Sequence, residues 1–500
     1  MFRIRPQLTS TGHRVLTATL LIVLATAMPA CQRAAQSGVS MPAPTGATVD
    51  GIWEQAGYGK VLEVDGENVR VYDVCEIACA LASQEKLGDL GQVVEHDDKA
   101  MSIRHGIKDY HYTKLQELPP RCRAEDLAAN DALHNFDVLW RTFDEHYCCF
   151  ERRGVDWSAQ RELHRKRLTR DSTPTELYSV LIEMLDTFGD GHIQLDAPED
   201  VVAAHEQSQA KDVPEDNCPF PVSRELQQRI ADSYLETGHS YNRGIVRWGM
   251  ARPDVAYVQV NLMLLLADYE IPAGSDIMEF AGQYFEIAES VVYQRQDEID
   301  GARAIMGTIV SSLPDARAYI LDVRFNGGGK DGAALEIMNH FTAQRTQVGT
   351  IKARQGSGYT DQHPFFVTPS AKTFAGDVYV LTSPLTASAA ELVPMAAKVL
   401  PNVTQIGSSS EGIFSSTLDK TLPNGWEYTL SNEVYEDLDG HSAEGVGIAP
   451  RHTLDYSRNP RLFCERLLAQ LEDGDDAIEL ALALHARQLE DSQLRSALNP

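Results

Sequence analysis

The stretch Ala318-Tyr-Ile-Leu-Asp-Val-Arg-Phe-Asn-Gly-Gly-Gly329 joins a run of mainly apolar residues directly to three glycines. The apolar run predicts a buried strand, and the strands and helical segments that alternate around it predict an α/β fold with a parallel-rich sheet. Glycine has no Cβ, so its backbone can adopt positive φ and approach a ligand closely. The amides of Gly327 or Gly328 are therefore candidate donors to a carbonyl oxygen, and a flexible turn is the alternative interpretation.

A second strand-and-turn pattern follows further along the chain. Val378-Tyr-Val-Leu381 leads through Thr-Ser-Pro-Leu into Thr386-Ala-Ser-Ala-Ala-Glu391, which predicts a strand, a turn and a helix that begins on small residues. A serine at the start of a helix faces unpaired N–H groups and the positive end of the helix dipole. Ser388 is thus a candidate nucleophile with the Ala389 amide as an oxyanion donor, although serine is also a common helix cap.

Taken together, Asp322-Val-Arg-Phe-Asn-Gly-Gly-Gly329 and Thr386–Glu391 resemble the motifs of the carboxyl-terminal processing (tail-specific) serine peptidases, including the tricorn protease core. The resemblance spans residues 120–456 and is strongest at the motif clusters. It implies a catalytic core of the crotonase or Clp-protease type and hydrolysis of peptide bonds through an acyl-enzyme on Ser388. The chain has no His-Glu-x-x-His and no Cys-x-x-Cys, so we expect neither a metal nor a cofactor.

The resembling family activates its serine in two ways. One branch uses a lysine in a Phe-Gly-Lys-Gly setting, whereas the corresponding stretch Gly407–Ser415 contains no lysine. The tricorn-like branch uses a histidine in an Asp-Gly-His or Asp-Ser-His turn and a glutamate in a Glu-Gly-x-Gly-x-x-Pro segment. Asp190-Gly-His192 and Glu444-Gly-Val-Gly-Ile-Ala-Pro450 match both patterns. The resemblance therefore implies His192 as the general base and Glu444 as the carboxylate that steadies it.

One position departs from the tricorn-like pattern. That branch has a serine before the histidine, which relays to the glutamate, whereas this chain has Gly191. The sequence leaves open whether Glu444 contacts His192 directly, contacts it through water, or is a solvated turn carboxylate. His441 and His363 are the alternative bases. The alternative function is a non-catalytic peptide- or lipid-binding protein on the same scaffold, and Gly191 is the feature that favours it.

The N-terminus predicts export. Three arginines precede the apolar stretch Leu20–Met28, which is too short to span a bilayer and is typical of a secretory signal peptide. Met28-Pro-Ala-Cys31 resembles a bacterial lipobox, which implies a lipidated Cys31 and a periplasmic or outer-membrane-associated lipoprotein. Cleavage near Ala30 would instead release a soluble periplasmic or secreted protein.

Composition and patterning predict several domains within the 500 residues. Hairpin signals predict the β-rich domain and helical periodicity predicts the segment that ends at the histidine. The connecting region is too short for a complete PDZ domain and lacks its carboxylate loop. The predicted divisions are a signal peptide at 1–31, a linker at 32–49, a small β-rich domain at 50–118, a helical domain at 120–196, a connecting region at 197–250, the peptidase core at 251–456 and a helical tail at 457–500.

Charge and cysteine content narrow the partners and the compartment. A net charge of −28 argues against nucleic acid and anionic lipid headgroups as partners. The resemblance to the peptidase family implies a peptide or protein as the substrate. Without Cys31, seven of the eight cysteines remain, so at least one thiol is unpaired in an oxidising compartment. Spacing does not decide the connectivity. The candidate bridges are Cys75–Cys79 and a bridge from Cys122 or Cys218 to the Cys148-Cys149 pair.

Overall fold

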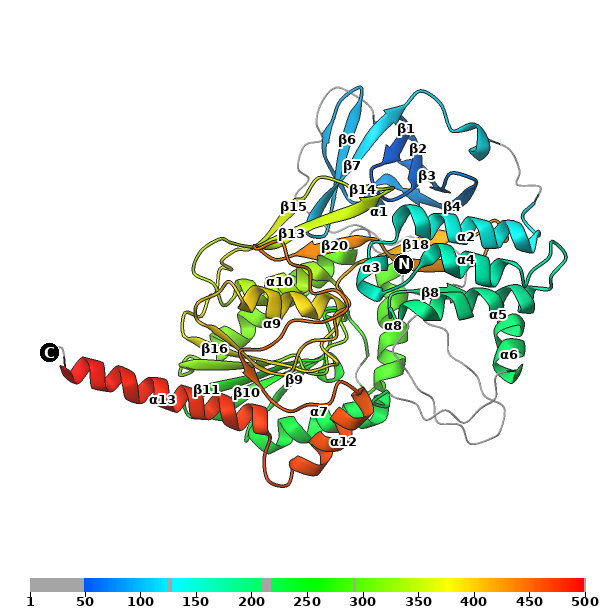
Figure 1. Ribbon diagram of the computed structural model, residues 1–500. Coiled ribbons are helices and arrows are strands. Elements are labelled where there is room, and N and C mark those ends of the chain that lie inside the picture. The colour runs from blue at the N-terminus through cyan, green and yellow to red at the C-terminus, as the bar shows by residue number, and fades with distance from the viewer. Residues whose placement is uncertain (1–48, 124–127, 209–216, 273, 291–293, 499–500) are drawn as a thin grey trace.

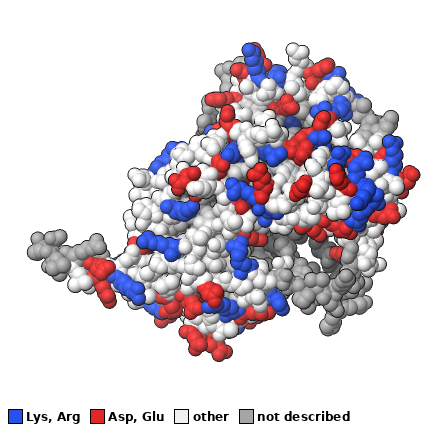
Figure 2. Space-filling model, viewed as in Figure 1, with Lys and Arg blue, Asp and Glu red and all other residues white. Residues whose placement is uncertain are grey.

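A computed structural model describes residues 49–123, 128–208, 217–272, 274–290 and 294–498 of the chain. It has an α/β core, a group of helices beside the core, and a small β-rich domain formed by the N-terminal segment (Figure 1). This arrangement confirms the predicted fold class. On the face shown in Figure 2, acidic and basic side chains are interspersed over most of the surface, so the net negative charge is not gathered into one large patch there.

The N-terminal segment forms a seven-stranded sheet in which every neighbouring pair is antiparallel. Its order is β4-β3-β2-β1-β7-β6-β5. Trp53 and Ile103 are fully buried in its core, because alternate residues of each strand face one side. The strands are β1 Gly51–Gln55, β2 Lys60–Asp65, β3 Asn68–Val74, β4 Cys79–Lys86, β5 Gln92–His96, β6 Ala100–His105 and β7 Lys108–Leu115, with the short helices α1 Leu87–Leu90 and η1 Pro120–Cys122.

The helical segment packs its apolar stripes into one core of aromatic and aliphatic side chains. Helix α2 begins where Asp131 accepts hydrogen bonds from two backbone amides, and α5 begins on a capping box between Thr173 and Glu176. The segment ends in a turn that carries His192 into strand β8. Its elements are α2 Ala132–His146, α3 Phe150–Arg153, α4 Trp157–Arg165, α5 Pro174–Leu185, η2 Asp186–Phe188 and β8 Gln194–Asp196, followed by α6 Glu199–Ser208.

The core is built on a seven-stranded sheet of order β21-β17-β16-β12-β11-β10-β9. The five strands from β21 to β11 are mutually parallel, and β10 and β9 extend the sheet antiparallel. Their buried, apolar sequences are those of strands covered on both faces. The strands are β9 His239–Tyr241, β10 Val246–Arg252, β11 Val255–Val260, β12 Ala318–Asp322, β16 Asp377–Thr382, β17 Val403–Gly407 and β21 His452–Thr453, and η3 Asn242–Gly244 joins β9 to β10.

Helices cover the two faces of this sheet. Alternate strand residues define the sides: Leu321 and Val380 pack in one cluster with α8, α9, α10 and α11, whereas Ile320 and Leu381 pack in another with α7, α12 and α13. Figure 1 shows α13 running across the sheet and projecting beyond it. The helices are α7 Phe220–Tyr234, α8 Ile277–Glu289, α9 Gln294–Ser312, α10 Asp331–Asn339, α11 Leu392–Ala397, α12 Pro460–Gln470 and α13 Asp476–Leu498.

Two small sheets connect these parts. One joins β13 to β14, β15 and β20, and the other has the order β18-β19-β8. In the second sheet, β8 brings the end of the helical segment against two core strands. The strands are β13 Thr346–Gln355, β14 Gly358–Tyr359, β15 His363–Val367, β18 Thr417–Thr421, β19 Glu427–Ser431 and β20 Glu433–Glu436.

Two predicted boundaries differ from the observed elements. The core sheet begins before residue 251, because β9 and most of β10 lie in the segment predicted as a connecting region and pair with β11. The region predicted as a helical tail is part of the core, since Phe463, Ala477 and Ile478 are fully buried against the sheet. Length defined the connecting region and composition defined the tail, and neither shows against which strands a segment packs.

The candidate disulfides were wrong. The bridges are Cys79–Cys122, Cys148–Cys149 and Cys218–Cys464, and Cys75 is a buried free thiol. The first closes β4 against η1, and the last joins the start of α7 to α12 across 246 positions. Such pairings follow from packing between distant elements, which cysteine spacing does not encode.

No helix within the described ranges combines the length and apolarity needed to cross a bilayer. The predicted signal peptide and Cys31 lie outside those ranges.

A buried ion pair fastens the N-terminal sheet to the core. The Lys108 ammonium, at the start of β7, contacts the Glu433 carboxylate of β20, and both side chains are almost fully buried. The Tyr58 hydroxyl donates to the same carboxylate at 2.5 Å. Burial opposes the charge on Lys108, but Glu433 raises the pKa of the ammonium to about 12. This joint therefore keeps both charges in a place that water does not reach.

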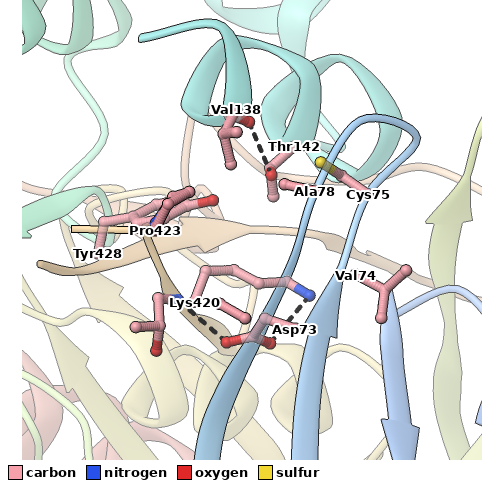
Figure 3. Close-up of a pocket in the computed structure, with 11 residues that line it drawn as sticks. Asp73, Val74, Cys75, Ala78, Val138, Thr142, Lys420, Pro423 and Tyr428 are labelled. Atoms are coloured by element: carbon pink, nitrogen blue, oxygen red, sulfur yellow. Dashed lines mark hydrogen bonds and ion pairs between the residues drawn. The ribbon is translucent and has the colours of Figure 1, made fainter. Parts of the chain in front are cut away.

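A second joint lies nearby, at the cavity drawn in Figure 3. This small pocket lies between β3, α2 and β18. Lys420 faces Asp73 across it with Nζ and Oδ1 3.3 Å apart, and Nζ also donates to the carbonyl oxygens of Tyr58 and Gly59. The lining contains none of the candidate site residues, so we assign it to the joint between domains.

Replacing Lys108 with methionine should destabilise the protein by ~3–5 kcal/mol, because Glu433 would remain buried without a cation. Urea unfolding of the purified protein measures this loss. The matched control is Arg104→Gln, which removes a pair with Asp109 near the same hairpin where the arginine side chain is 56% exposed. That change should alter the unfolding midpoint little. Equal midpoints for Lys108→Met and the wild type would contradict the assignment.

Candidate active site

Ser388 lies at the edge of the sheet where β12 and β16 end. It is the first residue of the short 3-10 helix η4, Ser388–Glu391, which continues into α11. Its φ is +53°, a left-handed backbone conformation that residues other than glycine rarely adopt and that costs roughly 1–3 kcal/mol. The predicted helix is thus a 3-10 turn before a six-residue helix. A strained turn therefore positions the serine, and the helix that follows is too short to give a large dipole.

The turn before Ser388 is bound to the end of β12. The Thr386 hydroxyl donates to the Val323 carbonyl at 2.9 Å, and the Ala387 amide donates to the Asn326 carbonyl at 3.0 Å. Both segments follow neighbouring parallel strands that end at the same edge of the sheet. The serine and the glycine triplet, 60 positions apart in sequence, therefore lie side by side.

Gly328 packs directly against the serine. A Cβ at this position would lie 2.6 Å from Ser388 Cβ and 2.9 Å from the Ala387 carbonyl oxygen, and its φ is +105°. Only glycine fits such a place. The Gly328 amide, however, donates to Asn326 Oδ1 at 2.9 Å. Among the described residues, the amides of Gly327 and Ala389 have no acceptor, so these two predicted donors remain available and Gly328 does not.

The structure brings His192 to the serine. His192 Nε2 lies 3.1 Å from Ser388 Oγ, across 196 positions of sequence. The His192 amide donates to Asp190 Oδ1 at 3.0 Å, and the Tyr147 hydroxyl donates to Asp190 Oδ2 at 2.9 Å. On the other side, Thr429 Oγ1 donates to the His192 carbonyl at 2.6 Å. The imidazole turn is thus held by the helical segment and by β19 together.

The surroundings of the imidazole favour its neutral form. Burial lowers the pKa of His192, the Asp190 carboxylate opposes this, and the Arg153 guanidinium reinforces it. The Ser415 carbonyl also acts on the ring and favours the protonated form. No acceptor within the described ranges makes a full hydrogen bond to His192 Nδ1. A neutral ring with Nε2 toward a hydroxyl is suited to accept its proton.

Glu444 lies in the same region but its carboxylate binds other groups. Oε1 accepts a hydrogen bond from Arg153 Nη2 at 2.6 Å, and Oε2 accepts from the amides of Phe414 and Ser415 at 2.8 and 3.3 Å. In the described part of the chain no hydrogen bond joins Glu444 to His192. The side chain is 2% exposed, so it is not a solvated turn carboxylate either. Burial raises the pKa of Glu444, and Phe414 and Arg153 oppose that rise.

The two alternative bases lie elsewhere. The His441 side chain is 80% exposed and lies beside Asp437. His363 Nε2 lies 3.2 Å from the Ile107 carbonyl, at the joint with the N-terminal sheet. Within the described ranges, neither ring forms a hydrogen bond with Ser388.

Two site residues were missed in the sequence. Arg153 stands in an Arg-Arg pair that gives no sign of burial, yet its guanidinium reaches Glu444. Glu391, in the serine motif, is fully buried and accepts hydrogen bonds from the amides of Gly412 and Ile413. It fixes the loop that also carries Ser415, and burial raises its pKa to about 8. The apolar surroundings of Glu391 in the motif were the only signal for its burial.

Two parts of the chain match the descriptions of known protein families. Residues 292–454 match the description of peptidase family S41, and residues 128–186 match that of the tricorn protease C1 domain. The S41 match falls within the α/β core, and the C1 match falls within the helical segment. The S41 match contains Ser388 and Glu444, and the C1 match ends six residues before His192. No curated protein matches the chain.

Several solved structures are similar to this protein. A protein from Parabacteroides merdae ATCC 43184 is 22% identical, with 68% of this chain and 96% of that chain covered and a TM-score of 0.49. Mature CPAF is 10% identical, with 70% and 99% covered and a TM-score of 0.46. The photosystem II D1 C-terminal processing protease is 15% identical, with 69% and 98% covered and a TM-score of 0.40.

Replacing Gly328 with alanine should destabilise the protein by ~1–3 kcal/mol, because the added methyl group meets Ser388 and backbone at a positive φ. Thermal unfolding measures the effect. Gly327→Ala is the matched control for stability, since a Cβ there has nothing within 4 Å and its φ is not left-handed. Equal melting temperatures for the two variants would refute the proposed close contact between Gly328 and Ser388.

Proposed function

We propose that this protein is a tricorn-like, tail-processing serine peptidase that cleaves peptide bonds through an acyl-enzyme. The observation that carries the proposal is the 3.1 Å contact between His192 Nε2 and Ser388 Oγ, beside two amides that have no acceptor among the described residues. A hydroxyl, an adjacent neutral imidazole and free amide donors are the groups that acyl transfer needs. The match to peptidase family S41 supports a peptide or protein as the substrate.

The path of the proton during the reaction follows from this geometry. As Ser388 Oγ attacks the carbonyl carbon of the peptide bond, its proton moves to His192 Nε2. The oxyanion accepts hydrogen bonds from the Gly327 and Ala389 amides, and the imidazolium then donates its proton to the leaving amine. Water then attacks the acyl carbon while His192 Nε2 takes its proton, and the imidazolium returns a proton to Ser388 Oγ as the bond between Oγ and the acyl carbon breaks. Glu444 stabilises the backbone beside the imidazole instead of bonding to the ring.

We also propose that the peptidase is exported. The three N-terminal arginines, the apolar stretch that follows them and the lipobox-like Met28–Cys31 support this, and they favour a lipid-anchored protein over a released one. The net charge of −28 is suited to a body that is held off an anionic surface. Metabolic labelling with a radioactive fatty acid, compared between wild type and Cys31→Ser, tests the anchor.

A fluorophosphonate probe tests the serine. It should label the folded protein, and Ser388→Ala should abolish the labelling. His192→Ala should keep the fold but reduce peptide hydrolysis by roughly 10²–10⁴-fold, because the base is lost. His441→Ala is the matched control and should hydrolyse peptides like the wild type. No labelling of the folded wild-type protein would favour the non-catalytic binding protein.

The pH dependence tests the imidazole. Hydrolysis needs neutral His192, and burial lowers its pKa from the ordinary value of 6.5. The value of kcat/KM should therefore stay level above pH 6.5 and fall only at lower pH, with an apparent pKa below 6.5. The measurement is made in Glu411→Gln protein, because burial raises the pKa of Glu411 to about 7 and its titration would overlap. An acid limb centred above pH 6.5 in that protein would contradict the assignment of His192 in this environment.

A further inference from the structure

Arg153 touches three segments that meet at the candidate site. It is the last residue of α3, and its side chain is only 11% exposed. Nη1 donates to the Gly189 carbonyl at 3.0 Å, in the turn that carries His192. Nη2 donates to Glu444 Oε1 at 2.6 Å and to the Gly412 carbonyl at 3.3 Å, in two loops of the core. One guanidinium therefore bonds the histidine turn to the core.

The same guanidinium lies between two buried carboxylates. Nη2 is 3.9 Å from Asp190 Oδ1 and 2.6 Å from Glu444 Oε1, and the two carboxylate side chains are 0% and 2% exposed. Burial and the like charge of Asp190 both raise the pKa of Glu444, and the Arg153 guanidinium opposes that rise. The planar fork of arginine suits the position, because it can donate to several acceptors in different directions.

We propose that Arg153 is a positioning residue of the Ser388–His192 pair, which clamps the histidine turn to the core through its hydrogen bonds to Gly189, Gly412 and Glu444. This rests on the proposed function. The clamp gives Glu444 an effect on His192 without direct contact, since the path runs from Glu444 through Arg153 to the turn that carries the imidazole. Asp190 holds the amide of His192 from the same turn.

The two charges beside the imidazole act in opposite directions. The Asp190 carboxylate favours the imidazolium, and the Arg153 guanidinium disfavours it. The other groups that face this cluster are the Tyr147 hydroxyl, the Ser415 carbonyl and the carboxylates of Glu444 and Glu411. Desolvation raises the pKa of Glu411 to about 7, so its own titration falls near that of a histidine. Glu411→Gln is therefore a necessary background for the measurement.

The decisive experiment is a pair of variants with opposite expected signs. In the Glu411→Gln background, Arg153→Met should raise the apparent pKa of the acid limb of kcat/KM, and Asp190→Asn should lower it. Arg153→Met should also reduce kcat/KM by about 10²-fold, because a histidine turn displaced by about 1 Å loses its alignment with the serine. Arg153→Lys keeps the charge but not the fork, so it should shift the acid limb less while still losing rate.

The matched control is Arg152→Met, on the same helix. Arg152 donates to the Ser442 carbonyl at 3.1 Å and is not among the groups that shift the pKa of His192. Its replacement should leave both kcat/KM and the acid limb as in the parent. Equal losses in Arg152→Met and Arg153→Met, with the acid limb unmoved in both, would overturn the proposal, because a general packing role would then explain them. A wild-type rate and acid limb in Arg153→Met would overturn it as well.

A readout that needs no turnover separates this proposal from the proposed function. In Ser388→Ala protein, the pKa of the His192 imidazole can be followed by NMR of labelled histidine. Adding Arg153→Met should raise that pKa and adding Asp190→Asn should lower it, even if the wild type proves inactive. If Arg153→Met does not fold, Arg153→Lys and Asp190→Asn still give the comparison. Unchanged imidazole titration in these variants would overturn the clamp while leaving the serine assignment intact.

Discussion

The pairing of β8 with β19 is the constraint on which the candidate site depends. Only three residue pairs form this ladder, yet it brings the end of the helical segment onto the core. His192 stands two residues before β8, so the register of the ladder sets where the imidazole lies. A ladder this short is not rigid by itself. Hydrogen bonds from Tyr147 to Asp190, and from Thr429 to the His192 carbonyl, complete the restraint from both sides.

The serine depends on a different and more robust constraint. Strands β12 and β16 are adjacent and parallel in the middle of the core sheet, so the segments that follow them emerge at the same edge. The Thr386 hydroxyl and the Asn326 carbonyl then bind these segments together. The nucleophile and the amide donors are thus fixed by the sheet, whereas the base is delivered by a separately packed helical segment. Any motion between those two units would change the Oγ to Nε2 distance first.

This difference explains what could be predicted from the sequence. The strand-and-glycine motif and the serine motif are local patterns, so the α/β core and the candidate nucleophile could be predicted from the residues, whereas the resemblance to the tricorn-like branch was needed to assign His192 to Ser388. The occupation of the Gly328 amide by Asn326, and of the Glu444 carboxylate by Arg153, depends on side chains from distant segments. The disulfide predictions were wrong for the same reason, since Cys218 meets Cys464 only after two helices pack together. Arg153 had no local signature at all.

Gly191 has a physical explanation in the bonds of Glu444. A Cβ at this position would lie 3.0 Å from Ile413 Cδ1, which is the flexible end of a side chain, so crowding alone does not forbid a serine here. A relay hydroxyl, however, needs a carboxylate oxygen to donate to, and both oxygens of Glu444 already accept hydrogen bonds from Arg153 and from the Phe414 and Ser415 amides. Three of the roughly four acceptor positions of this buried carboxylate are therefore occupied, one of them by a charged donor. In this chain the Arg153 guanidinium joins Glu444 at one end to the Gly189 carbonyl of the histidine turn at the other.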